Sequence, residues 1–226
     1  MSLLRALTKL YRSKLPEPID VPNLLTYANE EAYRWYGLMV SPVLALNGGR
    51  LRWAGSHVDT LHGERLCDSL LIVRYPSHRH FVRMVLTPYY MLVANPIRER
   101  AVARFEASFT HAEALFPELT HDRVLLAFGH DDDAPEIEAS LIEAGGRRAY
   151  ATRVVSKILG PPRRRADAHP LHFSRLSLWA FDDQTAARDA LTPELTSQLE
   201  AAGLNTSLAL FRCKICAEML FKITLC

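Results

Sequence analysis

The chain has 226 residues, of which 49% are hydrophobic and 23% are charged, the composition of an ordinary soluble globular protein. This length holds one large domain or two small ones, with a substantial core. The net charge of +2 is too small to indicate nucleic-acid binding, and no apolar stretch reaches the roughly 18–20 residues of a membrane span. Four cysteines make no disulfide framework, so we expect reduced thiols and a cytoplasmic protein.

Residues 1–20 form an N-terminal amphipathic extension. Leu3, Leu7 and Leu10 recur at helical spacing with basic residues between them, which predicts a short helix. We expect this helix to dock on the body of the protein or on a second subunit. A basic membrane-surface helix and a targeting peptide are the alternatives. Pro16 and Pro18 end any helix here.

Residues 21–110 are predicted to form a first half. Its expected elements are a strand at 21–27, a helix at 29–46, a strand at 50–58, a turn at 59–66, a strand at 67–75, a helix from Ser77 and a strand at 101–109. Asn29 suits the N-cap of the first helix, and the pair Gly48-Gly49 suits its end. Pro42 lies inside that helix and predicts a kink or a break.

After a linker at 111–121, residues 122–212 are predicted to repeat the same order. The expected elements are a strand at 123–130, a helix opened by residues 131–135 and ended by Gly145-Gly146, strands at 147–158 and 171–181, a helix capped by Asp182 or Asp183 and interrupted at Pro193, and a strand at 204–212. Residues 213–226 form a C-terminal extension. Two short phrases also occur twice in the same order: Gly-Gly-Arg at 48–50 and 145–147, and Leu-Thr-Pro at 86–88 and 191–193.

This repetition predicts an internal duplication. Each half has the β-α-β-β-α-β order of a ferredoxin-like unit. A sheet of this unit carries helices on one face and leaves the other to be covered, and two such sheets can cover each other. We therefore predict an α+β fold in which two tandem ferredoxin-like halves form, within one chain, a fold like the dimeric α+β barrel.

The first half also resembles a known family. Tyr75-Pro76-Ser77, then Leu86-Thr87-Pro88-Tyr89-Tyr90, then Arg98 is similar to the pattern of the DUF1330 family: a strand ending in an aromatic-Pro-Ser turn, a helix, a Pro-Glu-Tyr corner and a helix arginine. Gly48-Gly49-Arg50 and Trp53-Ala54-Gly55 resemble its second strand. Tyr89 stands where the family usually has glutamate. The resemblance covers roughly residues 21–110.

The second half matches this pattern less well, because Phe181-Asp182-Asp183 replaces the aromatic-Pro-Ser turn and no tyrosine follows Glu194. The DUF1330 resemblance implies the dimeric α+β barrel superfamily. That superfamily includes cofactor-free and haem-using monooxygenases, chlorite dismutase-like and dye-peroxidase-like haem proteins, and stress-response barrels. The resemblance therefore implies the fold and leaves the activity open.

Five residues are the candidates for a ligand site. Trp53 and His57 have the same parity along a predicted strand, so their side chains should lie on one surface. Tyr36 and Tyr75 belong to a group of aromatic residues that suits a pocket for a small organic molecule, although such residues also fill ordinary cores. Arg98 could bind a carboxylate with both of its terminal nitrogens or make a structural ion pair.

Cofactor chemistry is weakly indicated. A haem needs one proximal histidine in an apolar cavity, and nine histidines leave that open, although we expect no cofactor and no metal. The acidic run 131–133 suits a helix cap better than a cation site. The basic run 163–165 suits a solvated loop. Cys213 and Cys216 with Cys226 fall short of the four ligands of a structural zinc site.

Two functional classes follow. The first is a small-molecule-binding enzyme with monooxygenase- or isomerase-like activity on an aromatic or carbonyl compound. The second is a non-catalytic binding or assembly protein of the same fold. For both we expect a small organic partner, no nucleic acid and no membrane span, and a homodimer stays open.

Overall fold

The computed structural model describes residue 8 and residues 10–114, 124–129, 135–158, 175–201 and 207–216. The chain divides into two compact units. The first unit gathers the described residues of Met1–Arg52, Leu71–His111 and Val155–Ala166, and the second those of Trp53–Leu70, Ala112–Val154 and Asp167–Cys226. Strands β2, β3, β4 and β6 each contribute residues to both units.

The element order of the first half agrees with the sequence-based expectation. The elements are β1 (Ile19–Tyr27), α2 (Glu30–Leu46), β2 (Arg50–His62), β3 (Ser69–Tyr75), α3 (His78–Val85), the π-helix η1 (Tyr90–Ala94), α4 (Asn95–Ala101) and β4 (Val102–Ala114). The Asn29 side chain accepts a hydrogen bond from the backbone N–H of Ala32 at 2.9 Å, which confirms the predicted N-cap.

Three details of this half differ from the prediction. Helix α2 runs through Pro42 without a break, and this proline is exposed, so water can bond the carbonyl that loses its N–H partner in the helix. Strand β2 continues through the first half of the expected turn at 59–66, since its residues up to His62 pair with a later strand. The segment after Pro88 is helical as far as Ala101, whereas the elements expected from the sequence included no helix between Pro88 and the next strand.

The second half contains β5 (Val124–Gly129), α5 (Pro135–Glu143), β6 (Arg147–Ile158), β7 (Arg175–Ala180), α6 (Gln184–Asp189), α7 (Pro193–Ala201) and β8 (Ser207–Cys216). The Asp183 carboxylate caps α6 by accepting from the N–H of Ala186 at 2.8 Å, as predicted. Pro193 begins α7, so the expected interruption separates two short helices. The acidic run 131–133, the basic run 163–165 and Cys226 lie outside the described residues.

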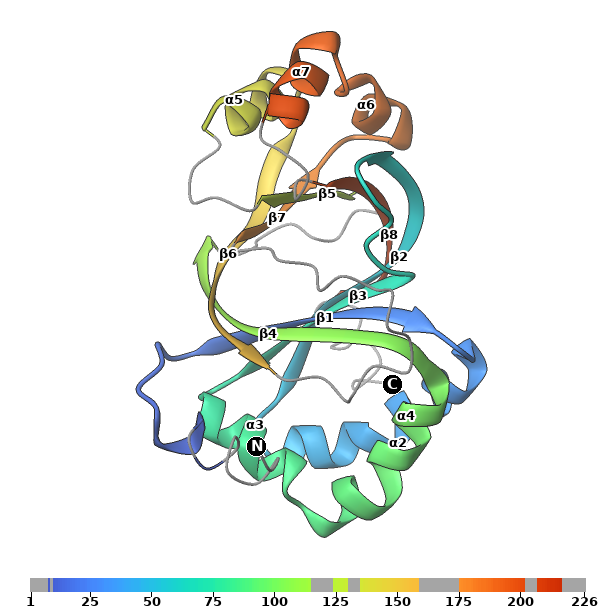
Figure 1. Ribbon diagram of the computed structural model, residues 1–226, viewed down its shortest axis with the longest axis vertical. Helices are drawn as coiled ribbons and strands as arrows, with labels where there is room; N and C mark the ends of the chain where they lie inside the picture. Colours follow the sequence, from blue (N-terminus) through green and yellow to red (C-terminus); the bar gives the residue numbers. More distant parts are fainter. Residues whose placement is uncertain are drawn as a thin grey trace, which may run out of the picture. The chain divides into compact units, whose positions relative to one another are not determined.

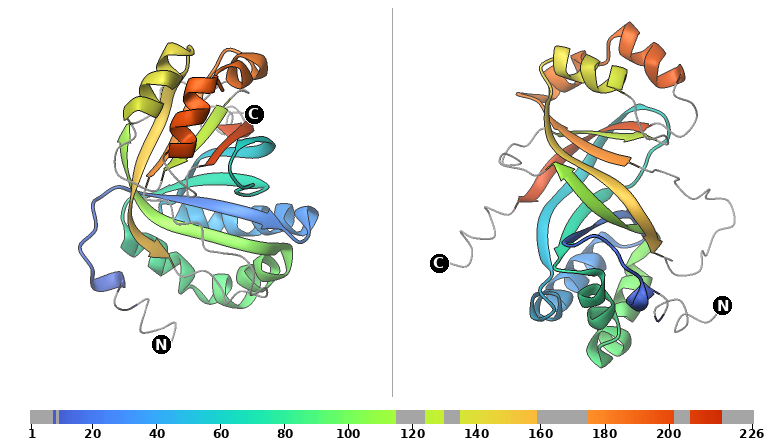
Figure 2. Two further views of the ribbon diagram at one scale, coloured as in Figure 1. Left: turned by 45° about the horizontal axis from the view of Figure 1, so that its top comes forward. Right: turned by 90° about the vertical axis from the view of Figure 1, so that its left-hand side faces the viewer.

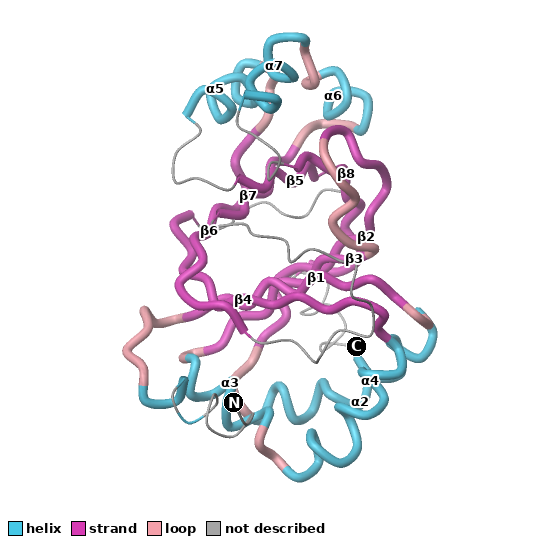
Figure 3. The backbone as a smooth tube through the Cα atoms, viewed as in Figure 1, coloured by secondary structure: helices cyan, strands magenta, loops and turns pink. Residues whose placement is uncertain are grey.

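In the first unit, helices α2, α3 and α4 cover one face of the sheet formed by β4, β1 and β3 (Figure 1, Figure 3). Strands β1 and β4 pair antiparallel, with Leu25 opposite Phe105. The buried core between helices and sheet consists of Ile19, Val21, Tyr36, Val43, Val73, Tyr75, Met84, Tyr90, Ala94, Ala107 and Phe109. Arg74 alternates with two of these residues along β3, so it points to the opposite face of the sheet.

On that opposite face, Arg74 and Asp20 form a bidentate ion pair, with both N···O distances at 2.7 Å. The Asp20 side chain is 1% exposed and the Arg74 side chain 18% exposed. A planar guanidinium and a carboxylate in this geometry satisfy each other's polar atoms, which makes the burial of the pair tolerable. The pair therefore holds β1 and β3 together on the face away from the helices.

In the second unit the strands pair antiparallel in the order β2, β8, β5, β7, β6. Helices α5, α6 and α7 group on one face of β5 and β7 (Figure 2). The buried core beneath them consists of Ile137, Leu141, Trp179, Phe181, Ala187, Ala190, Leu195, Leu199, Leu208 and Leu210. Within β8, Leu208 and Leu210 belong to this core, so Phe211 points to the other face.

The two glycine pairs end their helices in the same way. Gly48 and Gly145 have positive φ angles of 70° and 83°, the left-handed conformation that suits glycine after a helix. The next glycine packs under an aromatic ring in both places: a Cβ on Gly49 would lie 2.9 Å from the Tyr75 ring, and one on Gly146 would lie 2.7 Å from the Phe181 ring. The repeated Gly-Gly phrase thus corresponds to a repeated tertiary contact. No described helix has the length and apolar character needed to cross a membrane.

Candidate functional site

Trp53 and His57 lie on the part of β2 that pairs with β8. In this ladder Gly55 is opposite Cys213 and His57 is opposite Phe211. Side chains of directly opposite residues share a face of a sheet, and Trp53 and His57 share parity along their strand. Both rings accordingly contact Phe211: the Trp53 and Phe211 centroids are 6.4 Å apart, and those of His57 and Phe211 are 5.8 Å apart.

Trp53 is completely buried, with 0% exposure. Its indole N–H finds no hydrogen-bond acceptor among the described residues. A buried donor without an acceptor costs about 1–3 kcal/mol, so such a group calls for a water molecule or a ligand as its partner. Trp179 provides the comparison, because it is equally buried at 1% exposure and donates its indole N–H to Ser177 Oγ at 3.0 Å.

Gly55 makes room for the Trp53 ring. A Cβ at position 55 would collide with the indole of Trp53, because both positions point to the same face of β2. Any larger residue would therefore push the ring out of its place. The small residue between Trp53 and His57 fixes where the indole lies.

His57 is half-buried and hydrogen bonds through Nε2 to Thr60 Oγ1 at 2.9 Å. The hydroxyl can donate or accept, so it suits either tautomer of the imidazole. Burial lowers the pKa of His57 below 6.5, and the positive charge of Arg65 lowers it further, while Asp59 and Asp68 act in the opposite direction. These effects favour the uncharged form of the ring, which can accept a proton.

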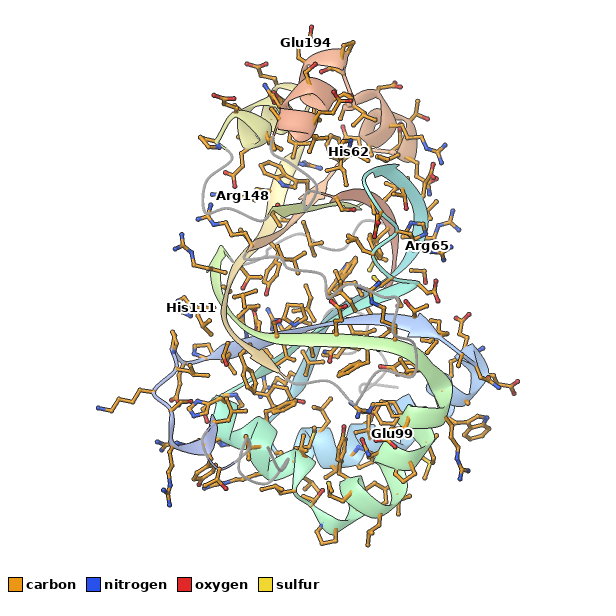
Figure 4. The ribbon with its side chains drawn as sticks, in the orientation of Figure 1. His62, Arg65, Glu99, His111, Arg148 and Glu194 are labelled. Atoms are coloured by element: carbon orange, nitrogen blue, oxygen red, sulfur yellow. The ribbon has the colours of Figure 1, made fainter. Side chains whose placement is uncertain are left out.

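Arg65 lies on the segment that follows β2 (Figure 4). Its guanidinium donates to the Asp68 carboxylate at 2.6 Å, and the Asp68 carbonyl accepts from the backbone N–H of His57 at 2.9 Å. Ser69 Oγ in turn donates to the Gly55 carbonyl at 2.7 Å. These bonds tie the strand segment that carries His57 to the start of β3.

The other three predicted residues meet in the first unit. Tyr36 on α2 and Tyr90 on η1 belong to the same buried core, and the Tyr75 hydroxyl donates to Met84 Sδ at 3.5 Å. Burial raises the pKa of both Tyr36 and Tyr75, and the charge of Arg98 partly offsets this for Tyr36. Arg98 lies 4.7 Å from the Phe105 ring centroid and donates to Asn95 Oδ1 at 2.7 Å.

The structure thus separates the predicted residues into two groups. Trp53 and His57 belong to the second unit, and Tyr36, Tyr75 and Arg98 to the first. The tyrosines are core residues with partners inside the protein. The pair in the second unit contains a buried donor without one. Of the five predicted residues, Trp53 is therefore the one whose buried polar atom lacks a partner among the described residues.

Several neighbours of these residues were missed by the sequence-based prediction. Phe211 and Thr60 contact His57, and Tyr90 contacts Tyr36. Regular alternation along β2 would place Thr60 and His57 on opposite faces of the strand. Their contact depends on the register shifts between Ala54 and His62, which the sequence does not show. His78 is another buried residue, 1% exposed, whose ring nitrogens lack partners among the described residues, and it lies in the first unit.

Among the described residues, no group of three or more His, Cys, Asp or Glu side chains is placed to hold a metal ion. Cys67 and Cys213 are buried and reduced. The remaining histidines of the sequence include His121, His130, His169 and His172, which lie outside the described residues.

Comparison with known proteins identifies the fold. No family model matches the chain, and no curated protein matches it. An anthrone oxidase-like protein of known structure superposes with a TM-score of 0.56 at 12% sequence identity, covering 89% of this chain and 97% of that one.

Two other solved structures are similar over different lengths. RPA0582 of Rhodopseudomonas palustris, a protein of unknown function, has a TM-score of 0.43 at 26% identity over 48% of this chain and 92% of its own. A protein of Lactobacillus acidophilus NCFM, provisionally named a monooxygenase, has a TM-score of 0.48 at 11% identity over 88% and 95% of the two chains. The superposition on the anthrone oxidase-like protein assigns this chain a mixed α+β fold of the barrel-like type.

Proposed function

We propose that the protein binds a small organic molecule with a carbonyl or phenolic oxygen, at the face of β2 that carries Trp53 and His57. The observation that carries this proposal is the completely buried indole N–H of Trp53, which has no acceptor among the described residues. A ligand oxygen would remove the energetic cost of this orphaned donor. An aromatic ligand ring would be stabilised by the indole and by Phe211.

The neutral imidazole of His57 would act as a general base on such a ligand. The lowered pKa of His57 favours the uncharged ring, the form that can abstract a proton as a general base. His57 would take a proton from a carbon whose carbanion the bound carbonyl stabilises, either next to the carbonyl or through an aromatic ring, and the enolate oxygen that forms would accept a hydrogen bond from the Trp53 indole. A donor aimed at developing negative charge is the usual way in which a protein stabilises such a species.

The enolate formed by this proton abstraction could react in two ways, which correspond to the isomerase-like and monooxygenase-like activities expected from the sequence. Return of the proton to a different atom of the enolate gives an isomerase-type reaction. Addition of dioxygen to the enolate carbon gives a hydroperoxide, and loss of water from it gives a ketone, which is a monooxygenase-type reaction without a cofactor. The anthrone oxidase-like protein has the same fold at 12% identity, so its name suggests anthrone-like aryl ketones as probes.

A non-catalytic binding or assembly protein is the second candidate. One observation favours it: Tyr36 and Tyr75, from the predicted site, are 8% and 3% exposed and pack within the core of the first unit. Filled interiors of this kind serve stability. On this alternative Trp53 would hold a structural water molecule, and no organic ligand would depend on it.

We also infer that the chain arose by duplication of a ferredoxin-like unit and that its first half belongs with DUF1330. The strand order is β4-β1-β3-β2 in one half and β8-β5-β7-β6 in the other, and these are the same order when each half is numbered from its own first strand. The matching contacts of Gly49 with Tyr75 and of Gly146 with Phe181 support the same conclusion. Tyr75 ends β3 and Arg98 lies in α4, the places that the DUF1330 pattern implies.

The experiment that tests the function is a mass-spectrometric search for organic molecules that co-purify with the protein. The comparison uses Trp53→Phe, which removes the orphaned N–H and keeps an aromatic ring. Trp179→Phe is the matched control, because that indole is equally buried and already donates to Ser177. We expect a ligand with a carbonyl or phenol that is retained by wild type and by Trp179→Phe and lost from Trp53→Phe. Retention by all three proteins would contradict the proposal.

A further inference from the structure

The first unit exposes several large apolar side chains on adjacent helices. Trp35 and Leu38 on α2 are 60% and 67% exposed, and Leu92 on η1 is 77% exposed. We call this surface the α2–η1 face, and it comprises Trp35, Leu38, Leu46, Tyr89, Met91, Leu92 and Val93. Clustered exposed apolar residues mark a surface that something else covers.

The residues of α2 in this face follow one side of the helix. Trp35, Leu38, Pro42 and Leu46 recur at spacings of three and four, which places them on one stripe. Met39 belongs to the same stripe, and its carbonyl accepts a hydrogen bond from the Tyr89 hydroxyl at 3.1 Å. This bond sets the start of η1 beside the exposed stripe of α2, so the two apolar segments are neighbours.

The two apolar segments, in α2 and around η1, contain no charged residues, and each is flanked in the sequence by arginines. Residues 35–49 contain no charged side chain, and Arg34 and Arg50 flank them. Residues 84–97 also contain none, and Arg83 and Arg98 flank them. Arg34, Arg50 and Arg83 are exposed. The acidic side chains of these helices are Glu30 and Glu31 in the first turn of α2 and Glu99, which accepts from Asn95.

We propose that the α2–η1 face binds the surface of a lipid bilayer rich in anionic headgroups. Tryptophan, tyrosine and leucine beside arginine form the residue set that favours the boundary between headgroups and acyl chains. Anionic headgroups supply charges opposite to the flanking arginines. A second copy of the chain suits the face less well, because a two-fold interface would bring these arginines toward each other. The proposal is independent of the function assigned to Trp53 and His57.

The test measures co-sedimentation of the full-length protein with vesicles. The vesicles consist of phosphatidylcholine alone or of phosphatidylcholine with phosphatidylserine. We expect binding to the mixed vesicles, weaker binding to phosphatidylcholine alone and release by salt. The double variant Leu38→Ser/Leu92→Ser should partition at least about tenfold more weakly, because it removes two large apolar side chains from the contact. Arg34→Gln should weaken partitioning about fivefold.

Ile142→Ser is the matched control. Ile142 is 61% exposed on α5 of the second unit, so this variant removes a comparable side chain from a different surface and should bind vesicles as wild type does. Absence of vesicle binding by the wild-type protein would overturn the proposal. Equal binding by the double variant, with unchanged circular dichroism, would also overturn it. If the double variant instead converts a dimer to a monomer in analytical ultracentrifugation, the occupant is a second copy and the lipid proposal is wrong.

Discussion

The imidazole of His57 stands edge-on to the phenyl ring of Phe211, with their planes at 88° and their centroids 5.8 Å apart. The same phenyl ring contacts the indole of Trp53 at 6.4 Å. Edge-to-face contacts of this kind stabilise a particular mutual orientation of the rings. Phe211 therefore positions both side chains of the proposed site, although it lies far from them in the sequence.

Stability should fall in acid partly through His57. Its pKa is lowered by burial and by Arg65, so the folded protein binds this proton less readily than the unfolded chain does. The free energy of unfolding contributed by His57 is thus intact above the ordinary pKa of about 6.5 and falls as the pH drops below it. Urea titrations at a series of pH values should show a smaller acid loss for His57→Gln. An NMR titration in which His57 protonates at or above its ordinary value would contradict the lowered pKa.

Breaking the buried ion pair between Asp20 and Arg74 should lower the free energy of unfolding substantially. In Asp20→Asn the bidentate carboxylate partner of Arg74 is lost, and removing one member of a buried ion pair costs about 3–5 kcal/mol. The control is Asp182→Asn, because Asp182 pairs with Arg147 at 3.2 Å with side-chain exposures of 90% and 56%, and exposed pairs contribute about 1 kcal/mol or less. Equal losses in the free energy of unfolding for the two variants would show that Asp20 and Arg74 are not a stabilising pair.

Two glycine substitutions should have opposite effects. A Cβ at Gly49 would lie 2.9 Å from Leu44 Cγ and from the Tyr75 ring, so Gly49→Ala should lower the free energy of unfolding by about 1–3 kcal/mol. Gly37 lies inside α2 with open space around its Cα, so Gly37→Ala should raise it by about 0.5–1 kcal/mol. Thermal unfolding of both variants checks the prediction, and a stabilising Gly49→Ala would contradict the packing of Tyr75 on this glycine.

The buried phenols should make the protein sensitive to alkali. Burial raises the pKa of Tyr33, Tyr36 and Tyr75, so the folded state keeps protons that the unfolded chain releases above about pH 10. Stability should therefore decline as the pH rises past that value, and less steeply in Tyr75→Phe. Tyrosinate absorbance should develop together with loss of circular dichroism. Ionisation of all tyrosines in a protein that stays folded would contradict the burial of these hydroxyls.

The parts of the fold that depend on local residues could be predicted from the sequence. Asn29 and Asp183 cap helices because a short polar side chain before a helix accepts from its free N–H groups. The glycine pairs end α2 and α5 because Gly48 and Gly145 adopt positive φ angles. These signals lie within a few residues of the feature that they determine.

Features that depend on distant residues could not be predicted. The length of β2 is set by its pairing with β8, and the turn-like residues near Asp59 carry no sign of that partner. Tyr36, Tyr75 and Arg98 were grouped with Trp53 and His57 from composition and parity. They belong to different units because the boundary between the units falls within β2, after Arg52, and the sequence pattern does not indicate that boundary.

The proposed ligand site depends on the indole N–H of Trp53. Two-dimensional nitrogen–proton NMR observes this group directly. The chain has three tryptophans, so Trp53→Phe and Trp179→Phe assign their signals. Titration with a panel of aryl ketones, anthrone among them, should move the Trp53 indole signal downfield as its N–H gains an acceptor and leave the Trp179 signal in place. Binding of a ketone with the Trp53 signal unchanged, or binding that persists undiminished in Trp53→Phe, would show that the ligand site lies elsewhere.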